Sequence, residues 1–440
     1  MRKLPASIVL LLLLQISVYA LDTLEEIRPK DTILIVAPHP DDAALAAGGL
    51  IQKALKKKTK VKVVYITSGK HNLASLILYK KFILKRKKGA LGLGRIRKEE
   101  SKQAAHMLGL KENDLFFLDY PDSGILKIFK KHWKDAVPFK DSLTKATQLA
   151  DKEGISCHSL YKGENILRDL EKVIIDIKPD KIFVPSPYDK NRDHIGSYLF
   201  LRLALFDLEN EITMPHLYLY LVHRGGLSIL ERYRPKDYLL TGKDDSGKWK
   251  ILKLSEDEIN KKKDAILKFK SQMYCKKFLL SFANDELFRE NKDLEIIGDT
   301  PLTLHLYNRR SKPLANMAVS IDNGFLHINI VFKKKTEAKY AKGTIYVFGY
   351  NKKKGLNNMS RIYLSFRAEK WNLYVHNKKM IKARGVSFRI NQYSCKMSIP
   401  MHELDNPRHL FMQADISLEL NTMSIPWQII NIEPKTPAES

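Results

Sequence analysis

Short apolar runs alternate with longer amphipathic stretches over the first 272 residues of the chain. Residues 32–37 and 61–67 are continuously apolar enough to form buried strands. The apolar spacing in residues 42–57, between them, is typical of a helix. The alternation continues with helical stretches at 72–84, 96–108 and 164–177 and with strands at 115–118 and 181–185.

This order of strand, helix and strand predicts an α/β fold. Its sheet is expected to be doubly wound and mostly parallel, with helices on both faces. Two segments, residues 70–94 and 121–163, are too long for ordinary connections, and we expect both to wall a substrate cleft. A last helical pattern covers residues 253–272, where Ser255 is a candidate N-cap ahead of three acidic residues.

The pattern changes after Asp299-Thr300-Pro301 to short stretches with a period of two. Such stretches predict a C-terminal all-β, sandwich-like domain, and we assign residues 21–299 to the α/β domain and 300–440 to the β domain. Trp371 and Trp427 are candidates to stack on sugar rings there, although aromatic residues in strands are more often core. The expected strands cover residues 326–332, 344–350, 361–366, 372–376, 386–390 and 409–418.

The N-terminus has the features of a cleavable signal peptide, predicted as residues 1–20. Arg2 and Lys3 precede an apolar run that is short for a bilayer span, and small residues before Leu21 suit cleavage. We therefore expect a secreted, periplasmic or cell-envelope protein, with a permanent membrane anchor as the weaker alternative. The odd number of cysteines, three, allows at most one disulfide.

The chain is strongly basic, with a formal net charge of +27 distributed over short lysine clusters. Solvated faces are the simplest explanation. An anionic partner, such as an acidic glycan or a membrane surface, is the functional alternative. No nucleic-acid-binding signature is present, so we expect no nucleic-acid partner.

His39, Asp41 and Asp42 lie together where the first predicted strand gives way to a helix. In open α/β sheets, ligands bind at this carboxyl edge. A histidine and two carboxylates this close together favour a bound cation, whereas capping of the helix would explain only one of the two aspartates.

A second polar cluster, Asp189 to His194, follows the predicted strand at 181–185. His39, Asp42 and His194 together would form a site of two histidines and one carboxylate. That donor set is typical of hydrolytic zinc enzymes that keep one position for water.

The segment from Pro38 to Asp42, followed by Gly48-Gly49, resembles the PIG-L/LmbE-type zinc-dependent N-acetylglucosaminyl deacetylases. The resemblance covers roughly residues 31–272. Further matching segments are Thr67-Ser68-Gly69, Arg97 to Glu100 with Ala104 and Leu108-Gly109, Leu118 to Asp122, and Ser271-Gln272.

The resemblance implies that His39, Asp42 and His194 bind Zn²⁺ and that Asp41 is the general base. It also implies the usual substrate of this family, an N-acetylglucosamine-like sugar. Arg97 and Asp122 are carried over as candidate substrate-binding residues, with a surface ion pair as the alternative for each. We add His71 to this group because it follows the second strand and could face the cleft.

Two positions depart from the family pattern. Ala43 stands where the family has glutamate, which removes an acceptor close to the metal ligands. Asn191 stands where histidine is frequent, but its amide could still donate a hydrogen bond to a tetrahedral oxyanion, and we predict a catalytic role for it.

The sequence therefore predicts a secreted zinc-dependent amide hydrolase that removes N-acetyl groups from amino sugars in a glycan or glycolipid. The alternative is a secreted glycan-binding protein that keeps the hydrolase fold after Ala43 and Asn191 impaired catalysis. The intact set of His39, Asp41, Asp42 and His194 favours the enzyme.

Overall fold

The structure is a computed structural model. The predicted signal peptide, and nearly all of the helical stretch expected at 72–84, lie outside the residues that it describes. It describes residues 22–24, 27–72, 86–150, 154–223, 248–297, 300–308, 313–333, 340–354, 359–380, 385–418 and 421–433.

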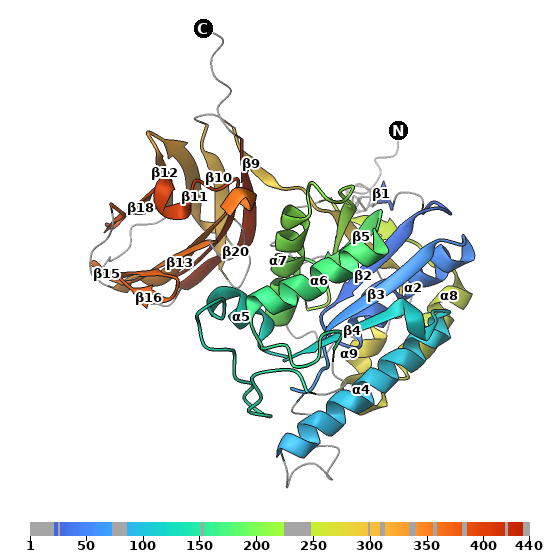
Figure 1. Cartoon of the computed structure of the whole chain (residues 1–440). Coiled ribbons are helices and arrows are strands. Elements are labelled where there is room, and N and C mark those ends of the chain that lie inside the picture. Colours follow the sequence, from blue (N-terminus) through green and yellow to red (C-terminus); the bar gives the residue numbers. More distant parts are fainter. Residues whose placement is uncertain are drawn as a thin grey trace, which may run out of the picture.

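An eight-stranded, mostly parallel sheet forms the centre of the N-terminal region (Figure 1). The predicted α/β fold is confirmed, and the expected strands at 32–37 and 181–185 have the predicted bounds. The strand order is β1 (Asp22–Thr23), β7 (Lys250–Leu252), β8 (Glu286–Glu290), β6 (His216–Tyr220), β5 (Lys181–Pro185), β2 (Thr32–Ala37), β3 (Lys60–Thr67) and β4 (Leu115–Tyr120). Only the pairings of β8, with β6 and β7, are antiparallel within this sheet.

Both faces of the sheet are covered by helices, because side chains of a strand alternate between its two sides. Ile33 and Ile35 of β2 belong to the apolar core beneath α2 (Asp42–Lys56), α4 (Arg86–Leu108) and α8 (Glu256–Ile266). Leu34 and Val36 belong to the opposite core, beneath α5 (Ile125–Lys131), α6 (Gly163–Ile177) and α7 (Arg192–Asp207). The result is a three-layer arrangement with a core on each side of the sheet (Figure 1).

Helix α2 contains a break at Ala47, where the backbone is not helical (φ −137°). The carboxylate of Glu286 accepts hydrogen bonds from the backbone N–H groups of Gly49 (2.6 Å) and Leu50 (2.8 Å). Lys262 donates to the same carboxylate at 2.6 Å, and both side chains are only 1% exposed. A buried ion pair therefore caps the second half of this helix.

Several elements differ from the sequence prediction. Helix α4 begins at Arg86 instead of at residue 96, where its start was expected. Helix α5 lies within residues 121–163, where no helix was expected. The apolar pattern after the second polar cluster predicts a helix at 195–205, but α7 begins at Arg192, which places His194 in its first turn. Helix α8 ends at Ile266, but the predicted N-cap is confirmed, since Ser255 forms a capping box with Glu258.

The C-terminal region is rich in antiparallel strands, as predicted. The strands form one twelve-stranded sheet, in which β10 and β20 are joined by only two residue pairs. Apolar side chains from both sides of this junction form a separate core. β9 pairs with β20 although it precedes the expected boundary at 299–301. The strands are β9 (Leu294–Ile296), β10 (Leu302–Asn308), β11 (Pro313–Asp322), β12 (Phe325–Phe332), β13 (Lys342–Tyr350), β14 (Ser360–Arg367), β15 (Lys370–Val375), β16 (Lys378–Lys379), β17 (Ser387–Ile390), β18 (Ser394–Pro400), β19 (His409–Leu418) and β20 (Asn421–Ile432).

The β region lies beside α5 and α7 (Figure 1). Aromatic side chains from both regions belong to one apolar core at this contact. The ring centroid of Phe129 in α5 lies 5.2 Å from the ring centroid of Phe200 in α7. It lies 5.8 Å from the ring centroid of Phe411 and 5.9 Å from that of Trp427. Trp427 is only 1% exposed. Its candidate role in stacking on sugar rings is therefore wrong and the alternative, a core position, is correct, because its ring fills the interface between the two regions.

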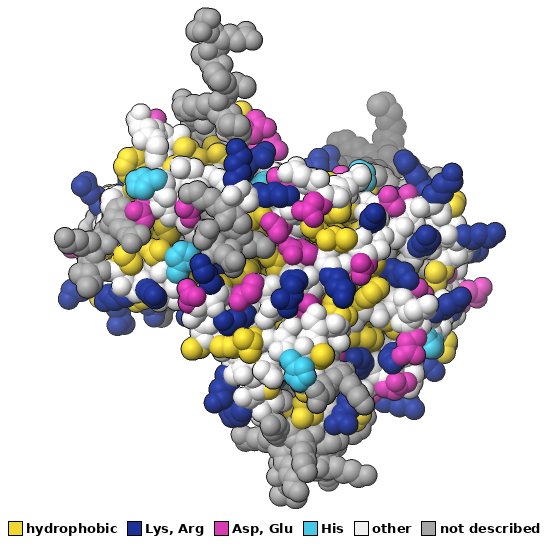
Figure 2. Space-filling view, viewed as in Figure 1, with side chains coloured by type: hydrophobic (Ala, Val, Ile, Leu, Met, Phe, Trp, Pro, Cys, Tyr) yellow, Lys and Arg dark blue, Asp and Glu magenta, His cyan; other side chains and the backbone are white. Residues whose placement is uncertain are grey.

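The surface view shows Lys and Arg side chains scattered over the visible face, in keeping with the spread of lysine clusters along the chain (Figure 2). The cysteines at 157, 275 and 395 are all free. Of the helices that the structure describes, none has both the length and the apolar character needed to cross a membrane.

Candidate metal centre and active site

The two polar clusters meet because β2 and β5 are parallel neighbours in the sheet. β3 pairs with β2 on its other side, so the strand order changes direction at this point. Loops after β2 and β5 diverge at such a switch point and leave a crevice for ligands. His39 and Asp42 follow β2, and His194 follows β5, at the same edge of the sheet.

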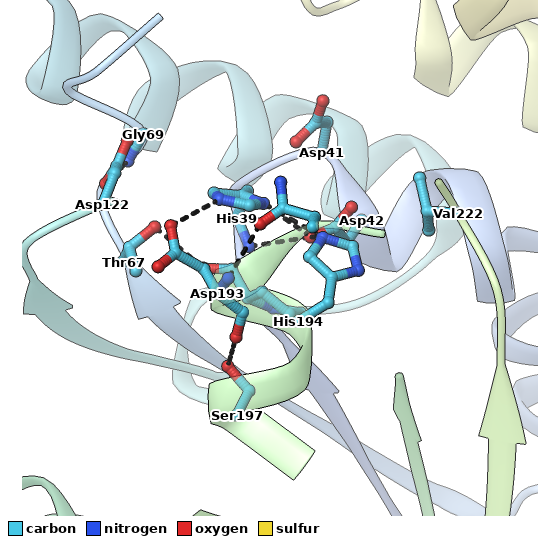
Figure 3. A network of polar contacts seen from close by, with 12 residues as sticks. His39, Asp41, Asp42, Thr67, Gly69, Asp122, Asp193, His194, Ser197 and Val222 are labelled. Carbon is cyan, nitrogen blue, oxygen red and sulfur yellow. Dashed lines mark hydrogen bonds and ion pairs between the residues drawn. The ribbon is translucent and has the colours of Figure 1, made fainter. Parts of the chain in front are cut away.

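Three donor atoms converge in this crevice (Figure 3). Oδ2 of Asp42 lies 3.0 Å from Nε2 of His194 and 3.2 Å from Nδ1 of His39. The two ring nitrogens lie 3.2 Å apart. Ligands about 2.0–2.1 Å from a tetrahedral zinc ion are separated by about 3.3–3.4 Å. The three donors therefore already form one triangular face of such a site, slightly contracted.

The second ring nitrogen of each candidate histidine ligand, the one that faces away from Asp42, lies next to another carboxylate. Nδ1 of His194 lies 3.1 Å from Oδ2 of Asp189, and Nε2 of His39 lies 3.4 Å from Oδ2 of Asp193. Carboxylates in this position orient metal-binding imidazoles and make them better donors. Asp193 is itself fixed by the backbone N–H groups of Ser123 and Ile125 at the start of α5.

The electrostatics of the crevice favour a cation. Burial opposes a charge on His194, but Asp189 and Asp42 outweigh it and raise its pKa to about 9. Burial likewise opposes a charge on His39, yet Asp193 and Asp42 raise its pKa well above the usual value. Contacts with the two histidines hold the pKa of Asp42 well below its usual range despite burial. A bound divalent cation would supply the positive charge that these carboxylates otherwise draw from protons, so the donor set fits a metal.

A fourth imidazole, that of His223, stands beside these donors. One donor atom from each of His39, Asp42, His194 and His223 lies within 4.8 Å of all the others. His223 follows β6, the neighbour of β5, and burial lowers its pKa. The sequence prediction missed this residue. The available signal was a histidine at the end of the period-two run 216–222.

Asp41 stands at the N-cap of α2 but makes no capping hydrogen bond with its side chain. Its Oδ1 accepts from Arg97 (3.0 Å) and its Oδ2 from Gln272 (2.9 Å). Two donors thus fix the carboxylate between α4 and the segment after α8. Arg97, expected to contact substrate, also donates to the carbonyl of Gly69 at 3.0 Å and is 4% exposed. Both contacts lie within the protein.

Gly69 has a φ of +72°, and a Cβ there would lie 2.2 Å from Nη1 of Arg97. Glycine is thus required both by the left-handed backbone and by the close approach of the guanidinium.

Asp122 and His71 organise the rim of the crevice. The Asp122 carboxylate accepts from the backbone N–H groups of Gly69 (2.8 Å) and His71 (3.0 Å), so it shapes the loop after β3. Nε2 of His71 lies 3.1 Å from Oδ2 of Asp141. Burial opposes a charge on His71, but Asp141 outweighs it and raises its pKa. This pair joins the loop after β3 to the segment 121–163.

The opening above the three donors is a cleft of about 760 Å³. Of the predicted site residues, all but His194 line it, and His194 is fully buried. Lys127, Lys190, Arg192 and Tyr274 also line the cleft. Residues from the expected cleft-wall segments at 70–94 and 121–163 thus contribute to it.

The two residues that depart from the family pattern have different surroundings. Ala43 is buried in the apolar core on the α2 side of the sheet. Asn191 is the N-cap of α7, where its Oδ1 accepts from the backbone N–H of Asp193 at 2.8 Å. Its Nδ2 lies 3.4 Å from Nε2 of His223. The predicted catalytic role of Asn191 stays a prediction.

Several known proteins are similar to part of this chain. No curated protein matches the chain. The similar solved structures include the N,N'-diacetylchitobiose deacetylase from Pyrococcus horikoshii, 19% identical, covering 59% of this chain and 84% of that one with a TM-score of 0.37. The 4-carboxy-2-hydroxymuconate hydratase GalB from Pseudomonas putida is 17% identical, covering 57% and 82% with a TM-score of 0.36. A deacetylase of teicoplanin biosynthesis is 15% identical, covering 55% and 85% with a TM-score of 0.35.

The family model described as PIG-L, GlcNAc-PI de-N-acetylase, matches residues 34–205. The matched range contains His39, Asp41, Asp42 and His194, together with the strands that bring them to one edge of the sheet. This match covers less than half of the chain, and it shows that residues 34–205 are similar to the PIG-L family and its deacetylase fold.

Proposed function

We propose that this chain is a zinc-dependent amide hydrolase that removes the acetyl group from an N-acetylglucosamine-like sugar in a glycan or glycoconjugate. The observation that carries the proposal is the triangle of donors from His39, Asp42 and His194, with separations of 3.0–3.2 Å. A zinc ion held there polarises the acetamide carbonyl and makes water more acidic.

In this proposal Asp41 takes a proton from the attacking water. A bond forms between the water oxygen and the acetyl carbon, and the bond from that carbon to nitrogen then breaks. The proton on Asp41 passes to the leaving amine, so the products are acetate and the free amino sugar. Arg97 and Gln272 hold the carboxylate in place, and each of its oxygens keeps a lone pair for the proton transfer.

An amino sugar as substrate is supported by the family match and by the lining of the cleft. The volume of about 760 Å³ lies in the range of small-ligand sites. Asn72, Lys127 and Arg192 line it with groups that can donate hydrogen bonds to sugar hydroxyls. A glycan with anionic groups fits the basic rim and the net charge of +27. We further propose that the protein acts outside the cytoplasm, on the basis of the leader-like residues 1–20.

Acetate release from N-acetylated chitooligosaccharides, measured for wild type beside Asp41→Asn, tests the hydrolase proposal. We expect Asp41→Asn to retain zinc and to lose about 100-fold or more in kcat, the usual contribution of a general base. Asp264→Asn is the matched control, because Asp264 is exposed on α8. Zinc binding without acetate release from any N-acetylated sugar would instead support the alternative, a binding protein that keeps the hydrolase fold.

A further inference from the structure

The imidazole of His223 has no role in the mechanism above, although it stands among the candidate ligands. Its ring contacts the ring of His194 edge-on, with centroids 4.8 Å apart, and lies parallel to Phe278 at 6.1 Å. It also lines the cleft. Figure 3 shows Val222, which follows β6 and precedes His223, on the same side of the site as Asp42 and His194.

The backbone of His223 is fixed to the same loop that carries the candidate ligand His194. Oδ2 of Asp189 accepts from the backbone N–H groups of Val222 (3.1 Å) and His223 (3.0 Å). The N–H of Lys190 donates to the carbonyl of His223 at 2.9 Å. Asp189 thus lies beside Nδ1 of His194 and also anchors the backbone of His223, so the two segments that carry these imidazoles are held together.

Asn191 determines which nitrogen of His223 carries the proton. The Oδ1 of Asn191 is committed as acceptor from the N–H of Asp193 at 2.8 Å, which leaves Nδ2 as the atom that faces His223. Because Nδ2 only donates, Nε2 of His223, 3.4 Å away, must accept. A neutral His223 therefore has its proton on Nδ1.

This tautomer argues against a fourth metal ligand. The lone pair of Nε2 points toward the amide of Asn191, and Nδ1 has a proton in place of a lone pair. The ring nitrogens of the two candidate ligands are placed differently from those of His223, because Nδ1 of His39 and Nε2 of His194 both lie next to the carboxylate oxygen of Asp42. Among the described residues, Nδ1 of His223 has no hydrogen-bond partner, so it is a donor available to a ligand in the cleft.

We propose that His223 is a further catalytic residue whose Nδ1–H donates a hydrogen bond to the acyl oxygen of the bound acetamide as that oxygen gains negative charge. Asn191 is then a positioning residue that keeps the ring in the required tautomer. This inference rests on the amide hydrolysis proposed above. It gives the chain an imidazole near the reacting carbonyl although residue 191 is asparagine.

The first test compares His223→Ala with wild type for acetate release and for zinc affinity. We expect kcat to fall about 100-fold, the effect of losing one oxyanion donor, with KM and the zinc dissociation constant changed less than about threefold. The matched control is His216→Ala, since His216 is exposed at the opposite end of β6. A zinc dissociation constant raised 10-fold or more would overturn the proposal and make His223 a ligand.

The role of Asn191 is tested with Asn191→Asp, which keeps an acceptor for the N-cap and removes the Nδ2–H donor. We expect this change to lower kcat in wild type and to have little further effect in a His223→Ala background, because both changes disable one unit. Fully additive losses would show that the two residues act separately and would contradict the positioning role.

A binding experiment decides the question without turnover. Calorimetry of acetohydroxamate with the zinc-loaded protein should show affinity about 10-fold weaker for His223→Ala than for wild type, because one hydrogen bond to the acyl oxygen is lost. Equal affinities would overturn the contact. If wild type releases no acetate from any substrate, the hydrolase proposal fails, whereas the calorimetric comparison still tests His223.

Discussion

Nδ1 of His39 lies 3.2 Å from Nε2 of His194, although 155 positions separate these residues in the sequence. Two neutral imidazoles cannot both point a lone pair at the other without a proton or a cation between them. Asp42 contributes an oxygen within 3.2 Å of both nitrogens. This relationship, more than any single motif, supports a metal centre at the edge of the sheet.

Asp189→Asn should weaken zinc binding about 10-fold to 100-fold, the usual effect of removing a carboxylate that orients a histidine ligand. Asp189 approaches Nδ1 of His194 at 3.1 Å and is itself buried. Competition with a fluorescent zinc chelator measures the change. Asp264→Asn, on the surface of α8, should leave the affinity unchanged. Unaltered zinc affinity in Asp189→Asn would count against His194 as a ligand.

Lys262→Met should lower the free energy of unfolding by about 3–5 kcal/mol, since it leaves the buried carboxylate of Glu286 without its partner. Glu286 also caps the second half of α2, so the loss should extend to the helix that begins at the site. Urea unfolding followed by circular dichroism gives the difference. Lys261→Met, the exposed neighbour, is the control and should change stability by less than about 0.5 kcal/mol.

Phe129→Ala should lower the free energy of unfolding by about 3–5 kcal/mol, because the ring fills the contact between α5, α7 and the β region. Gly196 permits the close approach of the two helices, since a Cβ there would lie 2.6 Å from the backbone nitrogen of Leu126. Chemical unfolding measures the loss, with the exposed Val137→Ala as control. A change below about 1 kcal/mol would mean that the β region is only loosely attached.

Glu171→Gln should stabilise the protein more at pH 9 than at pH 6. Burial, together with Asp207 and Glu211, raises the pKa of Glu171 to about 8. The folded protein therefore keeps a proton that the unfolded chain releases near pH 4.5. The resulting stability is complete below that pH and is lost as the pH rises through 8. Glutamine stays neutral and avoids the loss.

Melting temperatures at the two pH values measure the effect of Glu171→Gln. The control is Glu256→Gln, whose carboxylate is exposed in the first turn of α8. If the melting temperatures of wild type and Glu171→Gln differ by the same amount at pH 6 and at pH 9, the pKa of Glu171 is not raised.

The parts of the fold that local pattern determines were predictable. The strands at 32–37 and 181–185 were recognisable because residues 33–37 and 182–185 are apolar throughout, as expected in a covered parallel sheet. The meeting of His39 with His194 followed from placing both after parallel strands. Ser255 was recognisable as an N-cap because three acidic residues follow it in the first turn of the helix.

Features that depend on partners distant in the chain were not predictable. Nothing near Asp41 indicates that Gln272, 231 positions away, donates to its carboxylate. Nothing near Gly49 indicates the cap from Glu286. Arg97 was predicted to lie near the cleft, but its hydrogen bonds to Asp41 and Gly69 depend on the tertiary structure and were not predictable. His223 required knowing that β6 lies next to β5.

The central claim is tested most directly by reconstitution of the metal-free protein. After removal of metal with a chelator, acetate release from an N-acetylated chitooligosaccharide should be absent, and it should return with one equivalent of zinc per chain. His194→Gln should neither bind that zinc nor recover activity, whereas the exposed control His106→Gln should do both. Full activity in the metal-free protein, or one tightly bound zinc in His194→Gln, would contradict the account.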